Sequence, residues 1–433
     1  MAHRSILWFR RDLRLRDHPA LASALAQGEV LALFVDDPAF EGAGAPRRAL
    51  LHDCLRSLDV ATGGALVVRR GAPVDVVPTV AREVDADTVF VSKDFGPYGR
   101  RRDTDVAEAL TAAGRRLRGV GSPYAVEPGA VTKGDGTAYS VFTPFSRRWR
   151  DHGWDDPIEA PRSPQWIGAP SDGLPERPDL GIELPSADEA NVLGRWRTFR
   201  DSGLADYRRR RDLPAIDGTS RLSPYLKYGV VHPRQLLAES DARNEGHRVF
   251  QSELAWRDFY ADVLFRVPTS AWENLDDRFD RIHLDTGPHG REKFDRWCEG
   301  RTGFPIVDAG MRQLATIGWM HNRVRMIVAS FLVKDLHLPW QWGAKHFMDH
   351  LLDGDLASNN HGWQWAAGSG TDAAPYFRVF NPTTQQDRWD PDGEYVRQWV
   401  HELGTDDYPE PMVDHKLERV EALSRYEAVK RAS

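Results

Sequence analysis

Four short, mostly apolar runs recur through the first part of the chain, and a segment with helical character follows each of them. The runs are ILWF (6–9), VLALFV (30–35), ALVVRR (65–70) and DTVFVS (87–92). Short β-rich runs that alternate with helices are typical of a parallel sheet wound on both sides. The pattern predicts a doubly wound α/β domain over residues 1–130.

The pattern changes twice after this region. Residues 131–189 are rich in Pro, Gly, Asp and Ser, which predicts a long inter-domain linker running over the surface. From 190 to 433 the strand-like alternation disappears and helical periodicity dominates, as in FQSELAWRDFYADVLF (250–265). The expected fold is therefore an α/β domain, a linker and an all-helical domain.

Composition sets the broad class. With 433 residues, 41% of them hydrophobic and 28% charged, the chain is an ordinary globular protein too long for one compact core. No apolar run is long enough for a membrane span, and the charged start is unlike a signal peptide. Cys54 and Cys298 supply neither a disulfide framework nor a metal site, which suits a cytoplasmic location. The net charge of −7 argues weakly against nucleic acid, although a local basic face decides binding.

A ligand of the α/β domain is expected beyond the carboxyl ends of its strands. Asp36, Asp37 and residues 93–100 follow strand-like runs and fall at this edge. No G-x-G-x-x-G follows the first run, so the sequence does not favour a dinucleotide here.

The stretch DGDLASNNHGWQW (353–365) packs acid, amide and indole side chains closely together. It is not a calcium loop, because its twelfth position is Gln364, where Glu is required. Helix capping by Asp355 is the structural alternative. Capping leaves Asn359 and Trp363 unexplained, and at i,i+4 spacing these two share one helix face. An amide beside an indole suits a flat heteroaromatic ligand with polar edges.

Two further stretches carry polar groups at helical positions. GTSRLSPYLKYG (218–229) offers Thr219, Ser220 and Ser223 where a helix begins, a place where anions bind, although most such helix starts bind nothing. ELAWRDFY (253–260) places Glu253, Trp256, Arg257 and Tyr260 at i, i+3, i+4 and i+7. The structural alternative is an amphipathic helix with both aromatic rings in the core, but Glu253 would then be a buried carboxylate.

Two basic stretches also contain candidate site residues. In WMHNRVRM (319–326), Arg325 is expected to pair with Asp353, because a guanidinium matches a carboxylate. YRRRR (207–211) is either a solvated face or a phosphate-binding run.

Taken in order along almost the whole chain, these stretches resemble the DNA photolyase/cryptochrome family. The matching segments are WFRRDLRLRDHPAL, GTSRLSPYLKYG, ELAWRDFY, EGRTGFPIVDAGMRQLATIGWMHNRVRMIVASFLVKDL, DGDLASNNHGWQWAAGSGTDAAPYFRVFNP and YPEPMVDHK. The chain is most similar to bacterial-type class I photolyases, which repair cyclobutane pyrimidine dimers.

The resemblance implies an antenna domain, a linker and a helical domain that binds FAD, with FADH⁻ as the working form. Asp355 is expected at the polar edge of the flavin ring and Asn359 at its N5 atom, beside an Arg325–Asp353 ion pair. The FAD-binding residues implied are Tyr207, Thr219, Ser220, Arg221, Leu222, Ser223, Arg257, Asn322, Arg325, Asp353, Asp355 and Asn359.

The resemblance also implies UV-damaged DNA as the partner of a monomeric enzyme that works without a metal. A dimer flips out of the duplex to reach the flavin, and an electron passes to it and returns. The substrate residues implied are Glu253, Trp256, Asn322, Met326 and Trp365, and the phosphate-binding residues are Arg211, Arg323 and Arg378.

The sequence departs from the family in its electron chain and in its antenna. Trp363 and Trp340 match the proximal and middle tryptophans, but 278–295 contains no third, for which Trp272 and Trp342 are possible substitutes. The run KDFGPYGRRRD (93–103) is similar to the branch that binds 8-hydroxy-5-deazaflavin, although an acidic residue is missing at Gly96. An empty pocket is a rival, and methenyltetrahydrofolate fits less well. The antenna residues implied are Asp37, Arg48, Asp94, Gly99 and Arg100.

Two other functions are alternatives. A cryptochrome would signal through protein partners, but the substrate pocket is complete and no long tail follows the shared motifs. Repair of (6-4) photoproducts would need a His pair in the pocket, where Asn322 and Met326 stand instead.

Overall fold

The computed structural model describes the chain except for residues 1–2, 374–375, 377 and 432–433. It divides into two compact units. The first unit comprises residues 1–139, 143–205 and 220–268, and the second comprises 140–142, 206–219 and 269–433.

A parallel sheet of five strands forms the centre of the first unit. The strands are β1 (His3–Phe9), β2 (Gly28–Asp36), β3 (Leu66–Arg70), β4 (Thr88–Val91) and β5 (Arg116–Gly119). Their order is β3-β2-β1-β4-β5, and all neighbours run parallel. The first four coincide with the four apolar runs, whereas β5 was not predicted.

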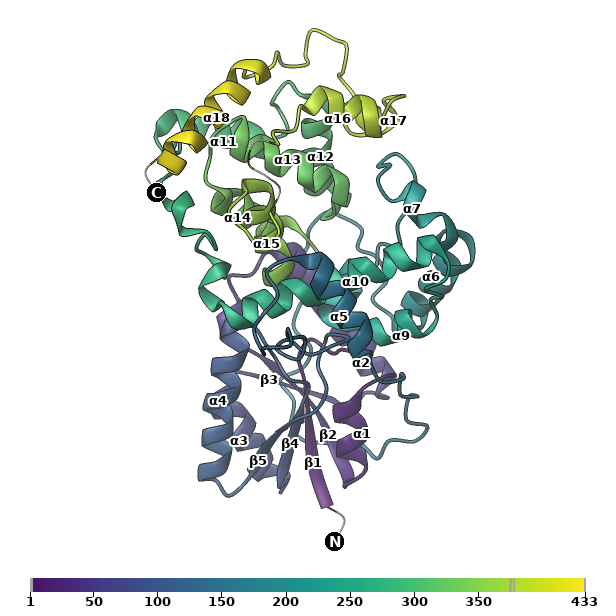
Figure 1. Cartoon of the computed structure of the whole chain (residues 1–433). Coiled ribbons are helices and arrows are strands. Elements are labelled where there is room, and N and C mark those ends of the chain that lie inside the picture. Colours follow the sequence, from purple (N-terminus) through teal and green to yellow (C-terminus); the bar gives the residue numbers. More distant parts are fainter. Residues whose placement is uncertain (1–2, 374–375, 377, 432–433) are drawn as a thin grey trace. The chain divides into compact units, whose positions relative to one another are not determined.

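Helices cover both faces of this sheet, as the α/β alternation predicts (Figure 1). They are α1 (Pro19–Leu25), α2 (Ala45–Ala61), α3 (Pro73–Glu83) and α4 (Pro97–Ala112). On one face, Ile6, Trp8 and Leu33 of the strands pack with Val80 of α3 and Val106 of α4. On the other, α1 packs against β1 and β4. The doubly wound architecture is confirmed.

The two edge strands of the sheet differ in what lies along their outer sides. At β3, the backbone of Val68 is bonded by the linker, since Asp172 N donates to Val68 O at 2.8 Å and Val68 N donates to Ser171 Oγ at 3.0 Å. At β5, the exposed side chains of Arg116 and Arg118 alternate along the strand.

The first unit also contains a short helix near the start of the chain and several helices from its middle. They are η1 (Pro38–Phe40), α5 (Phe142–His152), α6 (Glu189–Ser202), η2 (Leu204–Asp206), α8 (Ser223–Tyr228), α9 (Pro233–Ala238) and α10 (Glu245–Arg266), with α5 and η2 each including a residue of the second unit. The predicted linker therefore contains α5. Helices α6 and α8 to α10, expected in the helical domain, cluster with the sheet.

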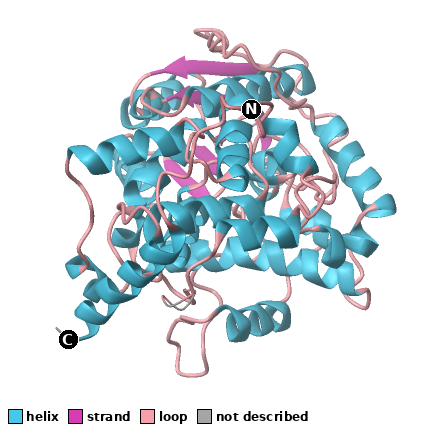
Figure 2. Ribbon diagram, turned by 90° about the horizontal axis from the view of Figure 1, so that it is seen from above, coloured by secondary structure: helices cyan, strands magenta, loops and turns pink. Residues whose placement is uncertain are grey.

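The second unit is helical, in agreement with the loss of strand-like alternation. Helices predominate over strands in the chain as a whole (Figure 2). Its elements are α7 (Tyr207–Arg210), η3 (Pro268–Ala271, whose first residue belongs to the first unit), η4 (Asp277–Arg281), α11 (Pro288–Cys298), α12 (Pro305–Ile317), α13 (Asn322–Lys334), α14 (Trp340–His350), α15 (Leu356–Ala367), α16 (Pro382–Trp389), α17 (Glu394–Trp399) and α18 (His415–Arg431). Buried residues of α12 to α15 form its core. Among the described helices, none has the length and apolar character needed to cross a membrane.

Candidate functional site

The predicted site residues fall in both units, and each group is described within its own unit. In the second unit, Asp355 is the N-cap of α15, because its side chain accepts a hydrogen bond from Ser358 N at 3.1 Å. Capping, which the sequence leaves open, is therefore part of the role of Asp355.

Arg325 and Asp353 form the predicted ion pair. Arg325 Nη2 lies 2.9 Å from Asp353 Oδ2, and Arg325 Nε donates to Met320 O at 2.8 Å. The Asp353 side chain is only 3% exposed, so its charge depends on such a partner. The pair joins α13 to the corner that precedes α15 and fixes where that helix begins.

The side-chain amide of Asn359 has a fixed orientation. Its Nδ2 donates to Ala344 O at 3.0 Å and to Asn360 Oδ1 at 2.8 Å. An amide nitrogen carries two hydrogens, so these bonds use both of them. The atom that remains for a ligand is Oδ1, a hydrogen-bond acceptor.

Two polar residues of α15 are structural, and the sequence reasoning missed them. Gln364 is fully buried; it donates to Ser270 O at 2.7 Å and accepts from Leu275 N at 2.9 Å. A ring nitrogen of His361 lies 2.9 Å from Ser270 Oγ, and burial lowers the pKa of His361 to about 4. Both residues hold the segment 270–275 against α15. Their partners lie some ninety positions earlier, so no local pattern reveals them.

The two predicted tryptophans of the electron chain are buried in the second unit. Trp363 is 2% exposed and Trp340 is 4% exposed. The ring of Trp363 lies against Gly343, where an added Cβ would stand 2.1 Å from the ring, so only glycine allows this approach of α14 to α15. Trp340 Nε1 donates to Asn274 Oδ1 at 2.9 Å.

Other indoles lie in the same unit. Trp297, which the sequence reasoning did not single out, is fully buried with its ring centre 6.0 Å from that of Trp363. Of the two possible substitutes for a third tryptophan, Trp272 is 60% exposed. The other, Trp342, has the guanidinium of Arg291 at 3.6 Å from its ring centre. A cation on the ring opposes removal of an electron from Trp342.

The substrate residues of the second unit lie on two packed helices. Asn322 is exposed and Met326 is half-buried, one turn apart on α13. Helix α13 packs against α15, which carries the half-buried Trp365.

The remaining substrate residues, Glu253 and Trp256, lie on α10 of the first unit. Glu253, Trp256 and Tyr260 are half-buried there, and the Trp256 and Tyr260 ring centres are 5.2 Å apart. The alternative in which both rings belong to the core is therefore wrong. Arg257 on the same helix is bonded to the backbone, since it donates to Pro123 O at 2.8 Å and also to the carbonyl of Leu226.

Asp258, next along α10, anchors this helix to other parts of the first unit. It accepts hydrogen bonds from Val126 N at 3.0 Å and from Trp149 Nε1 at 2.9 Å. Burial raises the pKa of Asp258 to about 6. The sequence reasoning did not single out this residue.

The stretch 218–229 begins a helix where the sequence predicts one. Helix α8 starts at Ser223, and the side chain of its N-cap Leu222 makes no capping hydrogen bond. Before it, Arg221 has a left-handed φ of 50°, and Ser220 Oγ accepts from Leu222 N at 3.4 Å. The N-cap side chain therefore satisfies none of the first backbone N–H groups of this short helix.

Two further predicted FAD-binding residues lie in the second unit. Thr219 is half-buried, and Tyr207 is the buried first residue of α7. The guanidinium of Arg211 lies 5.6 Å from the Tyr207 ring centre.

The three arginines predicted to bind DNA phosphates, all in the second unit, differ in their surroundings. Arg323 Nη2 lies 2.8 Å from Asp212 Oδ1, and its guanidinium lies 4.6 Å from the ring centre of Trp389. Arg211 is 3.9 Å from the same carboxylate. Arg378 is exposed.

The predicted antenna residues lie at the carboxyl edge of the sheet in the first unit. Asp37 accepts a hydrogen bond from the Tyr98 hydroxyl. Asp94 pairs with Arg102 at 3.3 Å, and it lies so close to Gly99 that any side chain there would collide with its carboxylate.

The two antenna arginines also have internal partners. Arg48 donates to Glu41 O at 2.8 Å, and Arg100 donates to Phe265 O at 3.2 Å. Each antenna candidate therefore makes a contact within the chain, and its contact with a chromophore stays a prediction.

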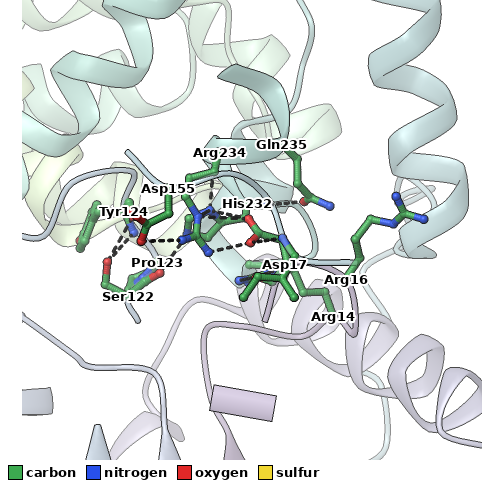
Figure 3. Close-up of polar contacts among 12 residues, drawn as sticks. Arg14, Arg16, Asp17, Ser122, Pro123, Tyr124, Asp155, His232, Arg234 and Gln235 are labelled. Carbon is green, nitrogen blue, oxygen red and sulfur yellow. Dashed lines mark hydrogen bonds and ion pairs between the residues drawn. The ribbon is translucent and has the colours of Figure 1, made fainter. Parts of the chain in front are cut away.

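The motif RDHPAL near the start of the chain builds a buried polar cluster of the first unit (Figure 3). Asp17 lies 2.6 Å from Arg234 Nη2 and 3.1 Å from His232 Nδ1. The other ring nitrogen of His232 lies 2.9 Å from Ser122 O, and burial lowers the pKa of His232 to about 4. Arg14 donates to the backbone oxygen of Asp17 at 2.7 Å. The motif thus connects the sheet region to α9.

Two family descriptions match this chain. "DNA photolyase" matches residues 5–164, and "FAD binding domain of DNA photolyase" matches residues 250–406. Among curated relatives, a deoxyribodipyrimidine photo-lyase of Thermus thermophilus is 42% identical and that of Salmonella typhimurium 39%. The alignment with the Thermus protein covers 97% of this chain and 97% of the relative. The alignment with the Salmonella protein covers 99% of each.

Solved structures share the fold. A bacterial class III photolyase from Agrobacterium tumefaciens has a TM-score of 0.93 at 34% identity, covering 100% of this chain and 98% of its own. An archaeal photolyase from Sulfolobus tokodaii with two FAD molecules has a TM-score of 0.86 at 29% identity, covering 98% and 100%. A cryptochrome of Synechocystis has a TM-score of 0.89 at 26% identity, covering 98% and 99%. The chain belongs to the DNA photolyase family.

Proposed function

We propose that this chain repairs cyclobutane pyrimidine dimers in DNA under near-ultraviolet or blue light, with FAD as its cofactor. Relatives named deoxyribodipyrimidine photo-lyase align over nearly the full length at up to 42% identity. The cryptochrome alternative has weaker support, because that neighbour shares 26% identity.

The observation that carries the proposal is the orientation of the Asn359 amide. Both Nδ2 hydrogens are bonded within the protein, so Oδ1 accepts a hydrogen bond from a ligand. A reduced flavin carries a hydrogen on N5, whereas the N5 of an oxidised flavin only accepts. Asn359 is therefore suited to reduced FAD, which when bound supplies the light-driven electron to the dimer and takes it back.

The remaining residues of the proposed FAD site orient and bind the cofactor. The Arg325–Asp353 pair holds charge beside the flavin ring, and Asp355 caps α15 while meeting the polar edge of the ring. The start of α8, where the apolar N-cap Leu222 makes no capping hydrogen bond, is assigned to the phosphates. The other residues assigned to FAD are Tyr207, Thr219, Ser220, Arg221, Leu222, Ser223, Arg257 and Asn322.

The substrate side of the proposal uses one carboxylate and two indoles. A flipped dimer stacks on Trp256 and Trp365, and stacking is worth about 1–3 kcal/mol per base. Glu253 hydrogen-bonds the polar edge of the dimer, and Asn322 and Met326 are assigned to the substrate as well. Arg211, Arg323 and Arg378 contact the flanking phosphates.

The proposal keeps the finer expectations from the sequence. The antenna chromophore is 8-hydroxy-5-deazaflavin, with an empty pocket or methenyltetrahydrofolate as alternatives. The functional domains are 1–130, 131–189 and 190–433, and Trp363 and Trp340 carry electrons to the flavin. The protein acts as a cytoplasmic, DNA-associated monomer.

The direct test is a repair assay. Chemically reduced protein is mixed with UV-irradiated oligothymidine and illuminated, and the base absorbance lost on dimer formation is followed. We expect the absorbance to return in light and not in darkness. No return in light, with reduced FAD bound, would reject repair and leave the photoreceptor.

A second test addresses Asn359 directly. In Asn359→Asp the carboxylate loses both donated hydrogen bonds and repels a reduced anionic flavin. We expect this variant to lose reduced flavin in air faster than the wild type, as measured from its absorption spectrum. The matched control Asn381→Asp changes a helix N-cap on α16 and should leave the spectrum unchanged. Equal oxidation rates in all three proteins would remove Asn359 from the flavin site.

A further inference from the structure

A cavity of about 210 Å³ lies beside Trp340, entirely within the second unit. Its walls come from the segment after η4, the corner between α13 and α14, the end of α15, and α18. The rings of Trp340, Phe279 and Tyr376 line it. An engineered apolar cavity of about 150 Å³ is large enough for benzene, so this one accommodates one substituted aromatic ring.

Two buried polar atoms of the lining have no hydrogen-bond partner among the described residues. They are Ser369 Oγ and His337 Nδ1, and their residues are 1% and 2% exposed. The other ring nitrogen of His337 lies 2.7 Å from Glu418 Oε2, so it carries the hydrogen, and Nδ1 is the acceptor. His337 also has a left-handed φ of 55°, which a non-glycine residue adopts at a cost. A buried polar atom without a partner is costly, and a ligand hydroxyl would remove that cost.

The position beside Trp340 gives the cavity a redox role. The indole N–H of Trp340 donates to Asn274 Oδ1, an amide oxygen that is not a base. Trp340 that has lost an electron to Trp363 therefore keeps its proton and its positive charge. The segment 278–295 contains no tryptophan that could serve as the third of the electron chain. Leu284 of this segment lines the cavity.

We propose that this cavity binds a monocyclic phenol that acts as the terminal electron donor to Trp340. An electron passes from the phenol to the Trp340 radical cation while the phenolic proton passes to His337 Nδ1. The products are neutral Trp340, a neutral phenoxyl radical and an imidazolium. Burial, which is the largest effect, and Arg425 lower the pKa of His337, whereas Glu418 and Asp285 act in the opposite direction. The inference rests on the proposed function, because it requires Trp340 to lie on an electron path.

Binding is tested first, in darkness and with the intact FAD-loaded protein. Hydroquinone is titrated by calorimetry into the wild type, Leu284→Phe, which fills the cavity, and Leu403→Phe, which makes the same change on a loop that does not line it. We expect about tenfold weaker binding in Leu284→Phe alone. Equal binding in the three proteins, or none in any, would overturn the inference.

Electron transfer is tested by flash photolysis of the oxidised flavoprotein. We expect hydroquinone to shorten the lifetime of the tryptophan radical in a saturable way in the wild type. In Leu284→Phe the effect should be linear in concentration. His337→Asn, which tolerates the left-handed backbone but lacks the base, should bind hydroquinone and reduce the radical more slowly. A linear effect in the wild type would mean collision with the surface and would overturn the proposal.

The experiments distinguish a failure of the proposed repair function from a failure of the proposed phenol site. Chemically reduced protein bypasses Trp340, so the repair assay reports only on the proposed function. Hydroquinone binding in darkness reports only on the cavity.

Discussion

Glu253 lies on α10 three residues before Trp256, and both are half-buried. This placement suits contact with a flipped base, because a carboxylate accepts hydrogen bonds from the polar edge of a pyrimidine while the neighbouring indole packs on its face. Glu253 is assigned to substrate and not to cofactor.

The assignment predicts a separation of the two functions. Glu253→Ala should lower the yield of repair per photon while FAD stays bound, because the proposal assigns this side chain to the dimer and not to the cofactor. Repair yield and flavin absorbance are measured together, with Glu245→Ala on the first turn of α10 as the matched control. A normal yield in Glu253→Ala would remove this residue from the mechanism.

Asp258 predicts a pH dependence of stability. Burial raises its pKa from 3.8 to about 6, so the folded protein binds this proton more tightly than the unfolded chain. The free energy of unfolding therefore falls as pH rises from about 4 to about 6, by at most roughly 3 kcal/mol. We expect the urea midpoint of the wild type to fall relative to that of Asp258→Asn over this range. Midpoints that change in parallel would contradict this assignment.

At the scale of elements, α15 combines support and chemistry in one helix. Asp355 caps it, Asn359 presents an acceptor, and Gln364 holds the neighbouring segment. The Arg325–Asp353 pair fixes the corner from which it starts. A change at the cap therefore displaces the ligand-facing amide as well.

Two substitutions at Asp355 separate these roles. Asp355→Ala should destabilise the protein by about 1 kcal/mol and weaken FAD binding. Asp355→Ser, which keeps a capping oxygen, should restore most of the stability without the carboxylate at the flavin edge. Urea unfolding and FAD titration are the measurements. Full recovery of FAD affinity in Asp355→Ser would limit Asp355 to capping.

The strands were predictable where burial leaves a local signature. Strands β1 to β4 are apolar runs packed on both faces, and all four were located. Strand β5 was missed because its sequence, RLRG, alternates exposed arginines at the edge of the sheet. Four central helices predicted to belong with the helical domain cluster with the sheet, since which helix packs where depends on contacts distant in sequence.

The site was predictable to a similar extent. The Arg325–Asp353 pair and the Asp355 cap follow from charge and local capping rules. Gln364 was missed because its partners lie far away along the chain. The cavity beside Trp340 was also missed, since segments distant in sequence build it.

At the scale of the whole molecule, an acidic chain must bind a polyanion. Its net charge of −7 gives no general attraction, so binding depends on individual arginines. These are not equivalent, because Arg323 is paired with Asp212 while Arg378 is exposed.

This difference predicts unequal salt effects. Each phosphate contact contributes about 0.9 to the slope of log affinity against log salt concentration. Arg378→Ala should lower the slope for damaged duplex DNA by about that amount, and Arg323→Ala should lower it less, because part of its charge is neutralised internally. Binding isotherms at several salt concentrations measure both. A larger change in Arg323→Ala would show that its pairing with Asp212 is exchanged for a phosphate.

The sheet edges bear on the behaviour of the protein at high concentration. Open strands recruit strands from other molecules, a frequent first step toward fibres. Here the edge strand β3 is hydrogen-bonded by the protein's own linker. The other edge strand, β5, carries exposed arginines, which would repel the same arginines of a second copy. A concentrated solution of the folded protein should therefore resist edge-to-edge assembly. Loss of the linker segment around Ser171 would expose one edge and remove half of this protection.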